Sequence, residues 1–165
     1  MARIKTSRAG RGYAAVGLVN PKHSTNVGSV LRAAGCYAVD LIAVEGQRGQ
    51  NSLVTSAATD TMKAWRHIPT LMTDDVFSVI PVGCVPVAVD LVPDAVSLVD
   101  FVHPESAFYI FGPEDGTLGA KHAKLGMARV MVPTHRCMNL AATVNVVLYD
   151  RLAKSMRAAQ EARAA

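Results

Sequence analysis

The sequence predicts an α/β fold, with a mostly parallel β-sheet flanked by helices. Short apolar runs that are typical of buried strands alternate along the chain with segments of helical pattern. The composition, 50% hydrophobic and 18% charged over 165 residues, is that of an ordinary globular domain. We therefore expect a single domain over residues 1–165, made of a basic arm at 1–12 and a core at 13–160.

The first part of the core predicts a strand, a helix and a second strand. The apolar run 14–19 is expected to be buried, and a helix over 27–34 follows it after a turn. The residues suited to cap this helix are Ser24, Thr25 and Asn26. We expect Gly35 to end the helix, the next strand to cover 40–44, and a weakly patterned helix to cover 52–62.

The middle of the chain has weaker signals. A strand is expected over 65–71, and a short helix, capped within 73–75, over the residues up to Ile80. The β-branched run 84–91 predicts another strand, whereas 93–103 has no clear pattern.

The last part predicts two more strands and a long helix. The apolar run 107–111 is the clearest strand of the chain, and a short helix (118–125) and a strand (129–133) are expected after it. From Asn139 onward, apolar residues recur at helical spacing. These residues are Leu140, Val144, Val147, Leu148, Leu152 and Met156.

The charge distribution and the cysteine content limit the partners and the cellular compartment that we expect for the chain. The net charge is +4, and the basic residues of the N-terminal arm are Arg3, Lys5, Arg8 and Arg11. Such an arm can contact phosphates, or it can be a solvated tail. No apolar stretch suits a membrane span or a secretory signal. The three cysteines form neither a disulfide framework nor a CxxC site, so we expect a reducing, cytoplasmic setting.

Three loops that follow predicted strands carry polar residues and glycines beyond the needs of a connector. They cover 20–32, 111–116 and 132–140. Ligands of parallel sheets bind beyond the carboxyl ends of the strands, so these loops are the candidate site. The sequence lacks the GxGxxG, GxxxxGK[ST] and GxSxG patterns of dinucleotide, phosphate-loop and hydrolase sites. The histidines show no metal-ligand spacing, and no metal is expected.

Each loop also has a simpler interpretation. Arg32 can reach a ligand near the start of its helix, or it can be a solvated arginine on a capped helix. The segment 111–116 can expose backbone groups to a ligand, or it can be a tight turn before an acidic helix start. Asn139 can be a polar site residue or the N-cap of the last helix.

In this order and spacing, the three loops resemble the motifs of the SpoU branch of the SPOUT superfamily of RNA methyltransferases. The first motif is matched by 26–33, where an asparagine and a glycine precede an arginine. The second is matched by 110–114, and the third by 132–140 together with 147–150. The resemblance spans about residues 14 to 152.

The resemblance implies an RNA 2′-O-ribose methyltransferase that uses S-adenosylmethionine. It also implies a deep trefoil knot in the C-terminal part. Knots are so rare in proteins that only the resemblance suggests one here. A homodimer is implied, with the final helix and the first-motif helix near the interface. The cofactor would be held largely by backbone groups of Val89, Gly112, Val132, Cys137, Met138 and Leu140. The short members of the group act on tRNA, including the wobble ribose of the anticodon loop, so tRNA is the expected substrate.

The same resemblance implies catalytic roles for Arg32, Glu114 and Asn139. A guanidinium stays protonated, so Arg32 is expected to grip a phosphate and polarise the hydroxyl rather than act as a base. Glu114 is expected to hold Arg32 through a charge-assisted bond, and Asn139 to orient the loop or the nucleotide. The residues expected to contact RNA are Asn26, Arg3, Lys5, Arg8, Arg11, Lys22 and Arg136.

Two positions depart from the family's pattern, and several alternatives stay open. Cys137 stands where serine is usual, and a thiol is a weaker hydrogen-bond partner than a hydroxyl. Thr117 stands where many members have a second glycine. The alternatives are an rRNA substrate, a related knotted enzyme that methylates a base, and a knotted RNA-binding protein without catalysis. Base-methylating members lack the first-motif arginine, and the missing glycine fingerprint disfavours a nucleotide-binding oxidoreductase.

Overall fold

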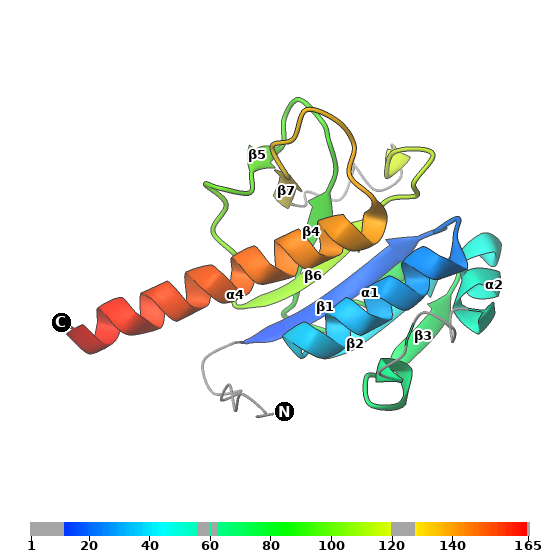
Figure 1. The fold of residues 1–165 in the computed structure, drawn as a ribbon, viewed down its shortest axis with the longest axis horizontal. Helices are drawn as coiled ribbons and strands as arrows, with labels where there is room; N and C mark the ends of the chain where they lie inside the picture. The colour runs from blue at the N-terminus through cyan, green and yellow to red at the C-terminus, as the bar shows by residue number, and fades with distance from the viewer. Residues whose placement is uncertain (1–11, 56–59, 61–62, 120–127, 165) are drawn as a thin grey trace.

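The computed structural model describes residues 12–55, 60, 63–119 and 128–164. Within these residues, seven strands form one sheet in the order β3-β2-β1-β6-β4-β7-β5, and all neighbouring strands are parallel (Figure 1). The strands are β1 (Tyr13–Val19), β2 (Leu41–Glu45), β3 (Thr70–Thr73), β4 (Val85–Val89), β5 (Val96–Ser97), β6 (Ser106–Phe111) and β7 (Ala128–Met131). The expected α/β fold with a mostly parallel sheet is confirmed.

Two long helices lie side by side on one face of this sheet. Figure 1 shows α4 (Leu140–Ala164), in orange to red, crossing the sheet beside α1 (Ser24–Tyr37) and extending beyond it at its C-terminal end. A shorter helix, α2 (Gln47–Thr55), follows β2, and two 3₁₀ turns are η2 (Ala64–Arg66) and η3 (Val76–Val79). Helix α4 follows the loop after β7 and runs back across the sheet. Asn139, at its start, bonds to Asn26 near the carboxyl ends of the strands, and Arg151 bonds to Glu105 near their amino ends.

Strand β1 shows how the core is divided between the two faces of the sheet. Val16 and Leu18 belong to the cluster that packs against α1 and α4, whereas Ala15 and Val19 belong to the cluster on the face of η3. Burial on both faces is typical of parallel sheets and explains the continuous apolar run. A Cβ on Gly17 would lie 2.6 Å from the Phe108 ring, so the missing side chain lets that ring pack against β1.

Helix α1 is longer than predicted at both ends. It begins at Ser24 after the N-cap residue His23, which has no side-chain cap hydrogen bond, so the prediction that residues 24–26 cap the helix is wrong. The helix continues through Gly35 and ends at Ala38, which has a left-handed conformation with φ of 54°.

The region after β2 also differs from the prediction. Helix α2 begins directly after β2, ahead of the predicted 52–62, because Gly46 with φ of +85° ends the strand in a sharp turn. The predicted strand 65–71 is replaced by η2 and β3. The buried Asp60 carboxylate accepts hydrogen bonds from the backbone N–H groups of Ala64 and Trp65, which stabilises a 3₁₀ turn there.

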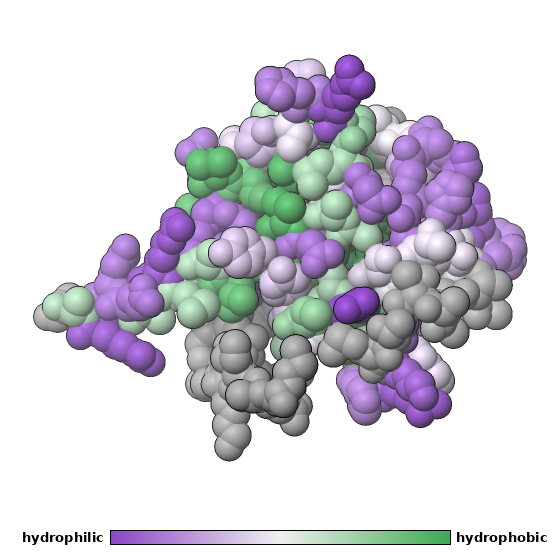
Figure 2. Space-filling model, in the orientation of Figure 1, coloured by the Kyte–Doolittle hydropathy of each residue, from purple (hydrophilic) through white to green (hydrophobic). Residues whose placement is uncertain are grey.

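Several predictions lie outside the described residues or stay untested. The arm residues Arg3, Lys5, Arg8 and Arg11 and most of the expected helix 118–125 are outside the described residues, and the C-terminal knot stays a prediction. None of the described helices has the length and apolar character of a membrane span. Figure 2 shows apolar side chains gathered beside α4, on the side of β5. The exposed large apolar residues of these elements and their connections include Val99, Val102, Tyr149 and Met156.

Candidate functional site

The three predicted site loops meet at the carboxyl ends of the parallel strands, which we call the carboxyl edge of the sheet. The register pairs Leu18 of β1 with Phe111 of β6, and Phe111 with Val89 of β4, which in turn pairs with Val130 of β7. These strands therefore end at the same level. The chain leaves β1 for β2 on one side, whereas β6 and β4 lie on the other side, and a crevice opens at such a switch point.

Side chains from all three loops form one hydrogen-bonded series at this edge. Asn26 of α1 donates from its Nδ2 to Glu114 Oε1 at 2.6 Å, and its Oδ1 accepts from Asn139 Nδ2 at 2.8 Å. The second oxygen of Glu114 accepts from the backbone N–H of Lys22 at 2.7 Å. We call the series Asn139–Asn26–Glu114 the amide relay. The three loops are thus brought together, as the sequence predicted.

Asn139 has two functions in this arrangement. Its Oδ1 accepts from the backbone N–H groups of Ala141 and Ala142, at 3.0 and 3.3 Å, so it is the N-cap of α4. Its Nδ2 is left to donate to Asn26. The helix cap therefore fixes the orientation of the amide. The simpler interpretation of Asn139 as an N-cap is confirmed, and its site role stays a prediction.

The Glu114 carboxylate is held in its charged form. Partial burial alone would raise its pKa, but hydrogen bonds from Asn26 and from the backbone N–H groups of Lys22 and His23 lower the pKa below the usual value. Glu114 is therefore an acceptor at neutral pH, and its charge keeps the first loop close to the second.

The expected bond between Glu114 and Arg32 is not found among the described residues. The carboxylate is occupied by Lys22, His23 and Asn26, whereas Arg32 is exposed on α1. Arg32 is six residues beyond Asn26, which places it about 9 Å further along the helix axis. Arg32 is therefore on the same helix as Asn26, but it does not line the cavity that opens between the second and third loops.

A cavity of about 190 Å³ opens between the second and third loops. Every residue that was expected to hold the cofactor lines it: Val89, Gly112, Val132, Cys137, Met138 and Leu140. A Cβ on Gly112 would lie 3.1 Å from the backbone nitrogen of Leu118, so a side chain here would push the loop back by a few tenths of an ångström. Apolar walls with exposed backbone groups suit a ring system bound by main-chain hydrogen bonds.

Comparison with known proteins identifies the family. A model described as the SpoU rRNA Methylase family matches residues 13–149, which is most of the chain. The chain belongs to this family. Its members are RNA methyltransferases that use S-adenosylmethionine. No curated protein matches the chain.

Solved structures of SpoU methyltransferases share the fold. AviRb from Streptomyces viridochromogenes, in complex with AdoMet, is 17% identical over 88% of this chain and 59% of its own, with a TM-score of 0.73. The TrmH/SpoU tRNA modifying enzyme of A. aeolicus is 13% identical over 88% and 77%, with a TM-score of 0.76. A structure from work on 2-OH methylation of C/U34 on tRNA is 21% identical over 87% and 96%, with a TM-score of 0.70. The present chain thus spans about three-fifths of AviRb.

Both departures from the SpoU pattern line the cavity. Cys137 is exposed with a free thiol, and Thr117, directly after the second loop, is also exposed. Asp90 joins this loop to β4, because its Oδ2 accepts from the backbone N–H of Leu118 at 3.2 Å. The second loop therefore closes over Gly112 with threonine in place of the usual glycine.

Two of the basic residues expected to contact RNA, Lys22 and Arg136, lie among the described residues, and one of them is close to an acidic side chain. Lys22 is exposed, but its Nζ lies 3.7 Å from Asp115 Oδ2. Arg136 is exposed in the third loop. Across the described part of the chain, no cluster of three or more His, Cys, Asp or Glu side chains is arranged to hold a metal.

Sequence reasoning missed Arg48, at the start of α2. Its guanidinium donates to both carboxylate oxygens of Asp115, at 2.9 and 3.0 Å, and to the backbone carbonyl of Asn20. The sequence could have indicated this residue, because Gly46 and Arg48 follow the carboxyl end of β2, just as the three predicted loops follow the ends of their own strands.

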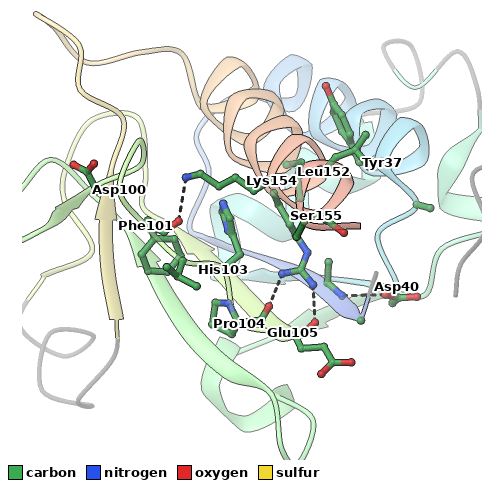
Figure 3. A pocket seen from close by; sticks show the side chains of 17 residues that line it. Tyr37, Asp40, Asp100, Phe101, His103, Pro104, Glu105, Leu152, Lys154 and Ser155 are labelled. Carbon is green, nitrogen blue, oxygen red and sulfur yellow. Dashed lines mark hydrogen bonds between the residues drawn. The ribbon is translucent and has the colours of Figure 1, made fainter. Parts of the chain in front are cut away.

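A second, larger cavity lies at the amino ends of the strands, which we call the amino edge of the sheet. It opens between α4 and the segment 98–105 (Figure 3). Its volume is about 580 Å³. The His103 ring is buried in its wall, with Nδ1 2.7 Å from the Tyr109 hydroxyl and Nε2 2.8 Å from Asp150 Oδ2. Burial lowers the pKa of His103, although the bond to Asp150 opposes this, and burial raises the pKa of Tyr109 to about 12.

The cations of the amino-edge cavity are bonded to backbone carbonyls. Arg151 donates to the carbonyls of Pro104 and Glu105, both at 2.6 Å, and Lys154 donates to those of Leu98 and Phe101. Figure 3 shows the Lys154 side chain reaching from α4 to Phe101. The donors of these two cations are thus bonded within the fold.

Proposed function

We propose that this protein transfers the methyl group of S-adenosylmethionine to a ribose 2′-hydroxyl of RNA, with tRNA as the substrate class and the wobble nucleotide of the anticodon loop as the target. The amide relay carries this proposal. It joins the three family motifs at one edge of the sheet, beside a cavity lined by all the expected cofactor residues.

The lining of the carboxyl-edge cavity fits the cofactor. Val89, Val132 and Leu140 provide apolar walls for the adenine, while Gly112 lines the cavity without a side chain and packs closely against Leu118. When bound, S-adenosylmethionine supplies a methyl group on a positively charged sulfur. Positive charge is lost from sulfur in the reaction, so the site has no large new anion to stabilise. Positioning of the ribose oxygen is therefore the main task of the protein.

Arg32 is proposed to position the nucleotide. Its guanidinium stays protonated, so it would grip the phosphate next to the reacting ribose and polarise the 2′-hydroxyl. The hydroxyl proton would leave to a phosphate oxygen of the substrate or to water. Arg32 is exposed and thus open to RNA. Glu114 and Asn139 would act on the helix that carries it, through Asn26.

A homodimer is proposed to complete the RNA surface. Helix α4 exposes Tyr149 at 61% and Met156 at 51%, which is unusual for large apolar side chains on a helix that also packs on a sheet. Pairing through α4 and α1 would cover these side chains. It would also double the positive patch formed by Lys22, Arg136 and the N-terminal arm. Affinity for RNA should then fall steeply with added salt, and a flat salt profile would remove the patch from the proposal.

Transfer of a labelled methyl group tests the reaction and the substrate together. The full chain is incubated with S-adenosylmethionine carrying a tritiated methyl group and with tRNA or rRNA from cells that lack the protein. Nuclease mapping with mass spectrometry then locates the product. A ribose methyl in tRNA is the expected result. A ribose methyl in rRNA would reject the substrate class, and a base methyl would reject the reaction.

Calorimetry separates the enzyme from a non-catalytic alternative. Cys137, in the cavity where serine is usual, is the observation that favours an RNA-binding protein without catalysis. Such a protein would release no heat when S-adenosylmethionine is added, whereas saturable binding is expected for the enzyme.

A further inference from the structure

One guanidinium joins two of the three site loops. Arg48 donates from Nε and Nη2 to the carbonyl oxygen of Asn20, at 3.2 and 2.8 Å, where β1 ends. It also donates from Nη1 and Nη2 to the two oxygens of Asp115, at 3.0 and 2.9 Å, in the loop after β6. Arg48 thus bridges the end of β1 and the loop that carries Glu114.

Helix α2 braces the first loop at two further points. A Cβ on Gly49 would lie 2.7 Å from the Pro21 ring, so the helix is packed directly against this residue. The hydroxyl of Ser52, which is buried, donates to the carbonyl of Lys22 at 3.3 Å. The backbone of 20–22 therefore rests on α2, and Arg48 extends this support to the second loop.

Two adjacent carboxylates divide the contacts of the second loop. Glu114 bonds to Asn26 and to the backbone of the first loop, whereas Asp115 bonds to Arg48 and lies 3.7 Å from Lys22 Nζ. The hydrogen bond from Arg48 lowers the pKa of Asp115, so the pair stays ionised at neutral pH. Because the two acids are neighbours in the chain, holding Asp115 also fixes the backbone from which Glu114 projects.

The Arg48–Asp115 pair is poorly placed to stabilise the fold. The side chains of Arg48 and Asp115 are 36% and 43% exposed, and exposed pairs contribute little to stability because solvent screens them. The planar two-point contact nevertheless fixes distance and orientation, which a single ammonium cannot do. The pair is therefore better suited to fixing the position of the second loop than to stabilising the fold.

We infer that Arg48 is a positioning residue of the methyl-transfer site, which holds the second loop so that Glu114 keeps Asn26, and with it the amide relay, in place. This inference rests on the proposed function. Lysine at position 48 would keep the charge but lose the simultaneous contacts to Asp115 and Asn20, so geometry and charge can be separated.

The kinetic test compares Arg48→Lys and Arg48→Met with a matched control. Arg129→Lys alters another part-exposed arginine–aspartate pair, Arg129–Asp94, neither member of which lines the carboxyl-edge cavity. At saturating RNA and S-adenosylmethionine, kcat should fall about tenfold in both Arg48 variants, with KM for the donor within about twofold of wild type. Melting temperatures should stay within about 3 °C of wild type, and the control should keep full activity.

A second measurement does not depend on turnover. Carboxyl-carbon NMR titration follows the Glu114 pKa, which should rise toward its usual range in Arg48→Met, because the bonds from Asn26 and the first loop loosen. If the wild type transfers no methyl group, the proposed function fails while this titration still tests Arg48. Two results would overturn the inference: an unchanged Glu114 pKa together with unchanged kcat, or a loss of kcat that is matched by weaker donor binding and a lower melting temperature.

Discussion

The two edges of the sheet carry polar networks of opposite character. At the carboxyl edge, side-chain amides and a carboxylate from three loops bond to one another around the smaller cavity. At the amino edge, Arg151 and Lys154 bond mainly to backbone carbonyls around the larger cavity. Helix α4 serves both edges, with its first residues at one and its middle at the other. The larger cavity is therefore not the better candidate site.

The difference follows from what each network satisfies. The segment 98–105 crosses the amino edge outside the sheet, and its carbonyls need donors, which α4 supplies. At the carboxyl edge, side chains of α2 donate to the carbonyls of Asn20 and Lys22, and side-chain to side-chain bonds fix the positions of Asn26 and Glu114. Changes at the amino edge should therefore reduce stability, and changes at the carboxyl edge should reduce turnover.

The largest effect is expected from Arg32→Ala, which should lower kcat about a thousandfold, near 4 kcal/mol, because the nucleotide is no longer positioned. Arg32→Lys should lower kcat about a hundredfold, because an ammonium cannot replace the planar fork. The melting temperature should not change, since Arg32 is exposed. Arg66→Ala, at an exposed arginine on η2, is the matched control in the same methyl-transfer assay. Near-normal turnover of Arg32→Lys with retained RNA affinity would refute the guanidinium role.

The next effect concerns stability. Arg151→Met should lower the free energy of unfolding by about 3 kcal/mol, because several part-buried oxygens lose a charged donor at once. Arg157→Met, an exposed position six residues along α4, should change it by less than about 0.5 kcal/mol. Urea denaturation measures both. Unaltered stability of Arg151→Met, or loss of S-adenosylmethionine binding by its folded form, would contradict the division between the edges.

The sequence predicted the chemistry of the carboxyl edge but not that of the amino edge. The strands and the three loops were predictable, because apolar runs and glycine- and asparagine-containing turns are local signals. Asn26 was misjudged as a helix cap, because its true partners, Glu114 and Asn139, are 88 and 113 residues away. The network of His103 and Arg151 was missed for the same reason, since it joins a segment without pattern to a helix dozens of residues later.

The pH dependence of stability should reveal the buried Tyr109 hydroxyl. The folded-state pKa is about 12, whereas the unfolded value is near 10, so the folded state keeps its proton longer. The stability that Tyr109 contributes is present below pH 10 and is lost as the pH rises through 12, by about 2–3 kcal/mol in all. The difference in unfolding free energy between wild type and Tyr109→Phe should shrink by that amount. Tyr149→Phe, at an exposed tyrosine of α4, is the control, and a pH-independent difference for Tyr109 would remove the assignment.

The smallest effect separates the two functions of Asn139. Asn139→Ser keeps a side-chain oxygen for the N-cap of α4 but removes the Nδ2 that donates to Asn26, so kcat should fall about tenfold, or 1.4 kcal/mol, with an almost unchanged melting temperature. Asn139→Ala loses both contacts and should also destabilise the protein by about 1 kcal/mol. Full turnover of the serine variant would mean that the cap alone accounts for Asn139. The bond from Asn139 to Asn26 would then be a consequence of how α4 begins, and catalysis at the carboxyl edge would depend on Arg32 and Glu114 but not on Asn139.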